Sequence, residues 1–357
     1  MGKVFYLALA MALSGLAIAA DKTRYPDVTP GRAIEFPRDE GSHPEFRVEW
    51  WYVTGWITGA DKRERGFQIT FFRARPDNVT EDNPSKFSPQ QILFAHVALS
   101  DPSEGKLLHA QRTARAGLGL AEAKTGLTHV WIQDWSLQQN GNRYRAKISA
   151  PQFAFDFQFE ANAQPMLNGV RGYSQKAPNP LAASYYYSIP QLKVTGSLTH
   201  RGNAQAVRGT AWLDHEWSSE YMDPGAAGWD WTGINFDDGA ALMAFRMRDG
   251  AGKTLWAGGT FRSRDGTMNV LSPENISFTP RKTWRSSRTG ANYPVSCTVR
   301  TGNREYELQP LMEDQELDSR DAMRAVYWEG AVRVLSGGNI IGRGYLELTG
   351  YGKPLKF

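Results

Sequence analysis

The two halves of the chain carry apolar and aromatic residues in the same order, and this internal repeat constrains the fold more than any other sequence feature. At a constant offset of 149 residues, four positions of the first half find counterparts in the second: Trp135 and Trp284, Tyr144 and Tyr293, Phe157 and Tyr306, Phe159 and Leu308. Three shorter blocks keep the same order: Thr54-Gly55-Trp56 with Thr232-Gly233-Ile234, Phe72-Arg73 with Phe245-Arg246, and Arg208-Gly209 with Arg343-Gly344. The repeat predicts two related domains in tandem, each long enough to bury its own core.

Short strands dominate both halves. Phe153–Glu160 and Tyr345–Leu348 alternate apolar and other residues with period two, as strands with one buried and one wet face do. Turn signals such as Asn140-Gly141 and Asp249-Gly250 recur roughly every ten residues. Each half holds about eight strand candidates, and a barrel of that size leaves room for side chains or one small ligand. We therefore predict an all-β fold of two tandem antiparallel β-barrels.

The N-terminal segment predicts export. Lys3 precedes an apolar run that ends at Ile18, so residues 1–20 resemble a signal peptide, with cleavage near Ala19–Asp21. We expect no membrane span in the mature chain, which has no other apolar stretch of sufficient length. The protein is thus predicted to be periplasmic or secreted. Within it, residues 28–219 are expected to form the N-terminal barrel and residues 220–357 the C-terminal one.

The composition favours a hydrophobic small-molecule partner. The chain has 41 basic and 37 acidic residues, a mild excess, and no basic run interleaved with aromatics that would indicate nucleic acid. Its 12 tryptophans suit barrel interiors and binding cavities, because their rings are large and amphipathic. The single cysteine, Cys297, cannot form an internal disulfide and is interpreted as a small buried residue.

The segment from Trp212 to Trp217 crowds three ionisable residues between two tryptophans. On a strand, Trp212, Asp214 and Glu216 share one face, while Leu213, His215 and Trp217 share the other. Two carboxyl groups beside an indole raise each other's pKa, so one could stay protonated near neutral pH. The repeat lays Asp214 on Thr349 and Glu216 on Tyr351, so the second half lacks these acids. The alternative is a buried hydrogen-bonded pair that braces the junction between the barrels.

No metal site or cofactor is predicted. Three neighbouring ligands on one strand point to opposite faces, and the sequence has no paired Cys/His spacing elsewhere.

Aromatic residues elsewhere could join Asp214 in space. Tyr185 and Tyr187 share one face of the Ser184–Ser188 strand and could offer hydroxyl groups or rings to a ligand; a plain aromatic core layer is the alternative. Glu49 precedes Trp50 and Trp51 in an apolar strand, where it needs a partner such as Arg47 or Arg73. Structural pairing is the favoured role for Glu49.

Two further residues complete the candidate set. His96 lies in an apolar strand and has Gly258 as its counterpart in the repeat, although a satisfied core histidine is the favoured interpretation. Lys176 could reach a bound carboxylate or carbonyl from a proline-rich loop. Its neighbour Ser174 lies in Gly172-Tyr173-Ser174-Gln175-Lys176, which departs from a nucleophile elbow and counts against serine hydrolysis.

Several ordered blocks resemble the carotenoid 1,2-hydratase and AttH-like family. They are His43-Pro44-Glu45 through Gly55, Phe94-Ala95-His96, Gly172 through Ser188, Trp212 to Trp217, and Gly344 to Tyr351, and together they cover nearly all of the mature chain. The resemblance implies two lipocalin-like (calycin) barrels. Carotenoid hydratases add water to a terminal isoprenoid double bond, related fungal proteins fold polyenes in cycloadditions, and the exported branch, which this chain resembles most, is loosely called predicted secreted hydrolase.

Hydration of an alkene fits these residues, because it needs a proton donor in a dry pocket, a stabilised carbocation and a guarded water. Asp214 is the expected acid, with Glu216 or His215 holding the water. The expected ligand-binding residues are Tyr185, Tyr187, Trp212, Trp217, Trp50, Trp51, Glu49, His96 and Lys176. Two alternatives are a lipid or ligand carrier accessory to an ABC-type or lipoprotein export system, and a secreted hydrolase.

Overall fold

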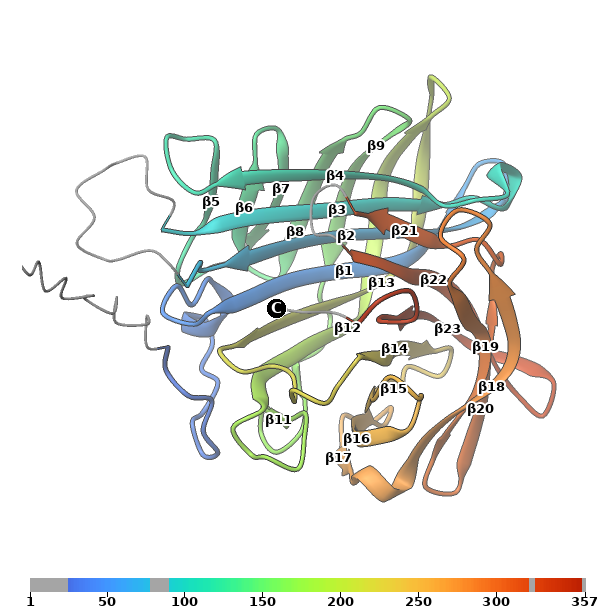
Figure 1. Ribbon diagram of the computed structural model, residues 1–357. Coiled ribbons are helices and arrows are strands. Elements are labelled where there is room, and N and C mark those ends of the chain that lie inside the picture. The colour runs from blue at the N-terminus through green and yellow to red at the C-terminus, as the bar shows by residue number, and fades with distance from the viewer. Residues whose placement is uncertain (1–24, 78–89, 321–324, 355–357) are drawn as a thin grey trace, which may run out of the picture.

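The computed structural model describes residues 25–77, 90–320 and 325–354, and within them the fold is all β with two antiparallel sheets (Figure 1). Three single-turn 3-10 helices, Arg38–Glu40, Pro102–Glu104 and Pro273–Asn275, are the only helical elements in this described part. No helix there is long and apolar enough to cross a membrane. The predicted signal peptide, residues 1–20, and its cleavage site lie outside the described residues.

The first sheet holds thirteen strands and runs in the order β4-β3-β2-β1-β13-β12-β9-β8-β7-β6-β5, with β10 and β11 both paired to β12. Arg112 on β4 donates to the carbonyl of Ile132 on β6 (3.1 Å), so the two ends of the sheet meet in a nearly closed barrel. The strands are β1 (Val48–Gly59), β2 (Glu64–Ala74), β3 (Ile92–Ser100), β4 (Leu108–Arg115), β5 (Ala121–Ala123), β6 (His129–Ile132), β7 (Trp135–Asn140), β8 (Arg143–Ser149), β9 (Phe153–Glu160), β10 (Met166–Leu167), β11 (Tyr173–Gln175), β12 (Ala183–His200) and β13 (Asn203–Ser218).

The second sheet holds ten strands and runs in the order β17-β16-β15-β14-β23-β22-β20-β19-β18, with β21 paired to β22. Its strands are β14 (Gly228–Phe236), β15 (Ala241–Arg248), β16 (Thr254–Arg262), β17 (Met268–Leu271), β18 (Ile276–Arg285), β19 (Asn292–Thr301), β20 (Arg304–Pro310), β21 (Glu316–Ser319), β22 (Ala325–Ser336) and β23 (Asn339–Leu348). The chain passes from one sheet to the other between Ser218 and Gly228. The exact domain ranges 28–219 and 220–357 stay a prediction.

The two sheets repeat the same strand order, as the internal repeat predicts. Residues at the offset of 149 fall on matching strands: β7 matches β18, β8 matches β19, and β9 matches β20. Tyr144 and Phe157 lie in the first core, and their counterparts Tyr293 and Tyr306 lie in the second. Both sheets have more strands than the eight expected, because short strands add to them: β5 and β17 at an edge, β10 and β11 beside β12, and β21 beside β22.

One block of the predicted alignment is displaced by a residue. Thr54 shares a strand face with Tyr52 and Trp56, and that face packs against the second sheet. Thr232 shares a face with Ile234, and that face lies in the second sheet's own core. Aligning Thr54 with Thr232 therefore matches opposite faces. Because a strand has period two, a shift by one residue exchanges all its faces.

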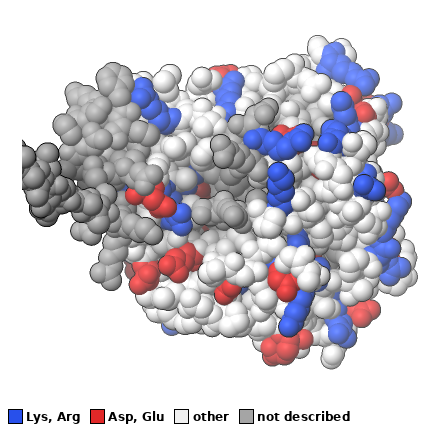
Figure 2. Space-filling model, viewed as in Figure 1, with Lys and Arg blue, Asp and Glu red and all other residues white. Residues whose placement is uncertain are grey.

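The outer faces of the sheets pack on each other and share a core. Trp56 on β1 donates to the carbonyl of Gly344 on β23 (3.0 Å), and Glu64 pairs with Arg333 and Arg343. Gly66 allows the close approach, since a Cβ there would lie 2.5 Å from that of Ala331. Basic and acidic side chains are interspersed over the face shown in Figure 2. The contact fixes how the sheets sit together and creates the cavity between them.

Candidate active site

A cavity of about 450 Å³ lies between the two sheets, and it is called the intersheet cavity below. Aromatic side chains from both sheets form much of its wall, among them Trp50, Tyr52, Tyr186, Tyr221, Trp229 and Trp231. The buried carboxyl groups of Asp214, Glu216, Glu329 and Glu347 also line it. A cavity of this size, largely apolar with a few convergent polar groups, is typical of small-molecule sites.

Asp214 is a buried acid on the first-sheet wall. It lies on β13 between Tyr52 of β1 and Ser188 of β12, its two ladder partners, and is 2% exposed. Its Oδ1 accepts hydrogen bonds from Ser188 Oγ (2.5 Å) and Trp212 Nε1 (2.7 Å). Burial nevertheless raises the pKa of Asp214 to about 8, because desolvation outweighs these bonds. Asp214 is therefore a protonated carboxylic acid at neutral pH.

Glu216 is neutralised by a buried lysine. Lys176 Nζ lies 2.8 Å from Glu216 Oε1, and Ser184 Oγ also donates to this oxygen. Burial raises the pKa of Glu216 and lowers that of Lys176, so the two groups are charged chiefly as a pair. Lys176 also donates to Ser174 Oγ (3.0 Å). Because the Glu216 carboxylate keeps Lys176 protonated, Lys176 is poorly suited to activate Ser174 as a nucleophile.

The second sheet contributes acids that the sequence reasoning missed. Glu329 and Glu347 are ladder partners on β22 and β23. Gln68 Nε2 donates to Glu329 (2.7 Å) and Trp229 Nε1 donates to Glu347 (3.0 Å). Burial raises the pKa of both carboxyl groups, that of Glu347 to about 7. The alternation Tyr345-Leu346-Glu347-Leu348 places Glu347 on the face interpreted as wet, and that face packs against the other sheet.

Alternate side chains of the Trp212–Trp217 segment point to opposite faces of the sheet, as expected. Trp212 packs with the intersheet residues and lines a second cavity between the sheets, of about 380 Å³. Trp217 and Leu213 lie in the first core. His215 lies on the same face and forms hydrogen bonds with the Tyr187 hydroxyl and the Glu49 carboxylate. His215 therefore does not hold a water for Asp214 in the intersheet cavity, contrary to the sequence expectation.

The tyrosine strand presents the opposite face from the one expected. Tyr186 is the ladder partner of Glu216 and lines the intersheet cavity, whereas Tyr185 and Tyr187 lie in the first core. Directly paired residues of an antiparallel ladder share a face, so the register decides this. Ser-Tyr-Tyr-Tyr-Ser is symmetric about its centre, and the strand alone could not reveal the register. Tyr186 therefore occupies the cavity-facing position that was expected for Tyr185 and Tyr187.

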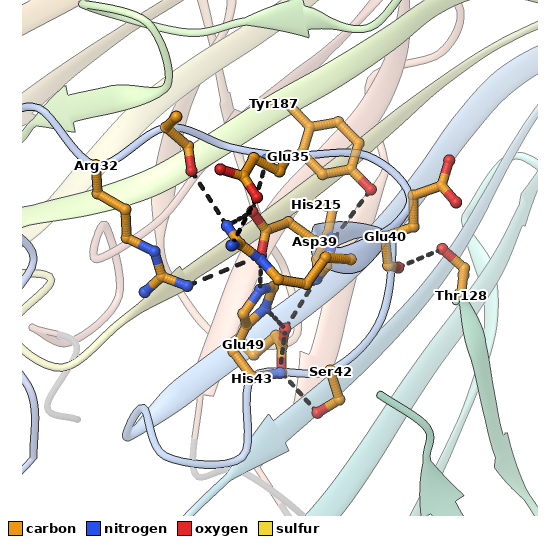
Figure 3. A network of polar contacts seen from close by, with 12 residues as sticks. Arg32, Glu35, Asp39, Glu40, Ser42, His43, Glu49, Thr128, Tyr187 and His215 are labelled. Atoms are coloured by element: carbon orange, nitrogen blue, oxygen red, sulfur yellow. Dashed lines mark hydrogen bonds and ion pairs between the residues drawn. The ribbon is translucent and has the colours of Figure 1, made fainter. Parts of the chain in front are cut away.

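Glu49 is the centre of a second buried network, inside the first barrel (Figure 3). Its carboxylate accepts from Arg73 Nε (2.8 Å), Ser42 Oγ (2.9 Å) and the two histidines His43 Nδ1 (2.8 Å) and His215 Nε2 (2.9 Å). Of the two arginines expected to pair with Glu49, Arg47 and Arg73, it is Arg73 that does so. Trp51 stacks on His215, with ring centroids 4.8 Å apart. Glu49 and Arg73 also line the intersheet cavity, whereas His43, Trp51 and His215 lie behind its wall.

The two histidines of this network differ in their hydrogen-bond partners and in the direction of their pKa shifts. His43 Nε2 also contacts Asp39 Oδ1 (3.1 Å), so both its nitrogens face carboxylates and both donate. These bonds raise the pKa of His43 although burial opposes them, while burial lowers the pKa of His215. His43, Glu49 and His215 offer ligand atoms within 4.8 Å of one another, a donor set that zinc accepts. Their atoms are already hydrogen-bonded, and Arg73 adds a positive charge beside Glu49, so we assign no metal site here.

The remaining candidates border the cavity. Trp50 lines it and packs edge-on against Tyr221, with centroids 5.0 Å apart. His96 binds the hydroxyl of Tyr327 through Nδ1 (2.6 Å) and Ser319 through Nε2 (3.0 Å), and Tyr327 lines the cavity. Burial lowers the pKa of His96 to about 3, so it is neutral. His96 is thus a buried histidine with both ring nitrogens hydrogen-bonded, and Tyr327 lies between it and the cavity.

Together these features define a two-sheet, lipocalin-like protein with an acidic and aromatic cavity between its halves. A family model described as AttH-like matches residues 27–351, and the chain belongs to this family. The crystal structure of a protein designated AttH from Nitrosomonas europaea is 50% identical, with a TM-score of 0.86 over 91% of this chain and 99% of that one.

More distant structures share the fold. Kievitone hydratase from Nectria haematococca is 17% identical, with a TM-score of 0.68 over 93% of this chain and 97% of that one. CghA is 12% identical, with a TM-score of 0.55 over 94% and 97% of the two chains. A search of curated proteins found no match.

Proposed function

We propose that this protein binds a neutral hydrophobic or amphipathic ligand in the intersheet cavity and adds water to one of its double bonds, with Asp214 as the proton donor. The observation that carries the proposal is a carboxylic acid whose pKa is raised to about 8, buried in a wall of aromatic rings. An acid that stays protonated at neutral pH is the group that hydration of an alkene requires.

The residues around Asp214 suit each part of this reaction. The Asp214 O–H bond breaks as the alkene's π electrons form a C–H bond with that proton, leaving a carbocation at the other carbon. Rings such as Tyr186 and Trp231 face the cavity and would stabilise the positive charge through their π faces. A water oxygen then bonds to the cationic carbon and gives up one proton, so that the net change is addition of one water.

The comparisons support the choice of reaction class. A hydratase, acting on kievitone by its name, shares this fold at 17% identity. Desolvation in this cavity raises the pKa of Asp214, Glu216, Glu329 and Glu347, so burying a further carboxylate there would be costly, and a neutral ligand is favoured over a fatty acid. We further propose, from the N-terminal sequence, that the protein acts in the periplasm or outside the cell. A carrier for an export system would use the same cavity without turnover.

The test is hydration of a neutral isoprenoid alcohol. Wild-type protein is incubated with farnesol in ¹⁸O-labelled water, and mass spectrometry detects a product heavier by one labelled water. Asp214 must be protonated to act, so kcat/KM should be lost as pH rises through about 8, the pKa of that carboxyl. Retention of farnesol without any product at pH 6 to 8 would favour a carrier instead.

A further inference from the structure

Two buried polar atoms that lie near each other in the intersheet cavity form no well-aligned hydrogen bond with any described residue. They are the hydroxyl of Tyr52 and Oε1 of Glu329, and the two residues are 7% and 2% exposed. Both residues line the cavity. A buried polar atom without a partner costs free energy, so native proteins usually supply one from a ligand or an ordered water.

The two atoms belong to opposite sheets. Tyr52 is the ladder partner of Asp214 on the first sheet, so both side chains lie on the same face. Glu329 lies on the second sheet beside its ladder partner Glu347. Gln68 reaches across from the first sheet to hold the other oxygen of Glu329 (2.7 Å). A ligand in the cavity therefore has an acid on one wall and a carboxyl pair on the other.

The carboxyl pair is suited to exchange a proton. Directly opposed residues of an antiparallel ladder have Cβ atoms roughly 5 Å apart, so two buried carboxylates there repel and the pair retains a proton. Trp229 donates to Glu347 (3.0 Å) and thereby favours ionisation of that member. With one proton present, the pair can accept another.

We propose that the Tyr52 hydroxyl and the Glu329–Glu347 pair hold the attacking water, and that the pair accepts the proton which the water loses. This inference rests on the proposed hydration. Tyr52 donates to the water oxygen, and the water donates to Glu329 Oε1. As the C–O bond forms, one O–H bond of the water breaks and Glu329 takes that proton at Oε1 as it passes the proton it held to ionised Glu347, while Asp214 supplies the proton to the alkene carbon. Return of one proton from the pair to Asp214 through solvent restores both groups for the next turnover.

The experiment separates proton transfer from water addition. In D₂O, Asp214 delivers a deuteron to farnesol; if no water attacks, the cation returns a proton to Asp214 and the alkene retains deuterium. The double variant Glu329→Gln/Glu347→Gln should lose hydration by at least about 100-fold, the usual scale of general base catalysis, yet still incorporate deuterium into unreacted farnesol. Glu305→Gln/Glu307→Gln on β20, outside the cavity lining, carries the same two substitutions and should match wild type.

Tyr52→Phe is the milder test, because it removes only a hydroxyl that makes no well-aligned hydrogen bond to a described residue and should leave the fold intact. It should lower hydration about tenfold and preserve deuterium incorporation. The inference is overturned if the double variant hydrates farnesol at the wild-type rate, or if either variant, while folded, loses hydration and deuterium incorporation together. Wild-type protein that shows neither reaction would instead refute the proposed function, and this inference with it.

Discussion

Asp214→Asn should abolish turnover while leaving the fold and the bound ligand in place. Asparagine keeps the size of the side chain and can accept from Ser188 and Trp212, but it has no carboxyl proton to give. We expect product formation to fall by roughly two to four orders of magnitude, the usual worth of general acid catalysis. The measurement is farnesol hydration by purified variant and wild type at pH 7, with farnesol retention measured in parallel.

Stability at high pH provides an internal check on this variant. The unfolded chain ionises Asp214 near pH 3.8, whereas the folded chain does so near 8, so between these values the folded state binds more protons. The wild type therefore loses stability as pH rises from about 4 through 8. Asparagine does not ionise, and the melting temperature of Asp214→Asn at pH 9 should equal or exceed that of wild type. The exposed Asp238→Asn is the matched control. A lower melting temperature for Asp214→Asn would indicate that Asp214 braces the sheets and is not an acid.

The two-sheet fold was predictable because its signals are local and repeated. Period-two alternation and regular turns predict strands, and the offset of 149 residues predicts that two halves share one topology, which the strand orders confirm. Thr54 was aligned with Thr232, one residue out of register, because both blocks begin with the same letters, Thr-Gly. Identity of letters carries no information on which face a side chain occupies.

The first-sheet acids were predictable and the second-sheet acids were not. Asp214 and Glu216 stand out because three ionisable residues between two tryptophans are costly to bury. Glu347, in contrast, occupies one alternate position of an ordinary amphipathic strand, where a glutamate usually faces water. Only the packing of one sheet on the other turns that position into a cavity wall, and such packing leaves no periodic signal in either strand.

Glu49 shows how the internal repeat separates fold-holding residues from chemical ones. Each sheet carries a buried acid that pairs with an arginine on the neighbouring strand. Arg73 on β2 donates to Glu49 on β1 (2.8 Å), and Arg246 on β15 donates to Asp230 on β14 (2.7 Å). Recurrence in both halves indicates a structural role, in agreement with structural pairing as the favoured role for Glu49. At the position aligned with Asp214 the second half has the uncharged Thr349, and the buried acid of the matching strand β23, Glu347, lies two residues away.

Glu49→Ala should therefore destabilise the protein by about 3–5 kcal/mol, because it leaves the fully buried Arg73 guanidinium without its carboxylate. It also removes the acceptor shared by His43 and His215. Asp156→Ala is the comparison: it breaks the exposed pair with Arg145, whose side chains are 42% and 49% accessible, and should cost less than about 1 kcal/mol. Urea unfolding followed by circular dichroism measures both. Equal costs would mean that the Glu49 network does not hold the barrel together, and Glu49 would then have to be reconsidered as part of the chemical site.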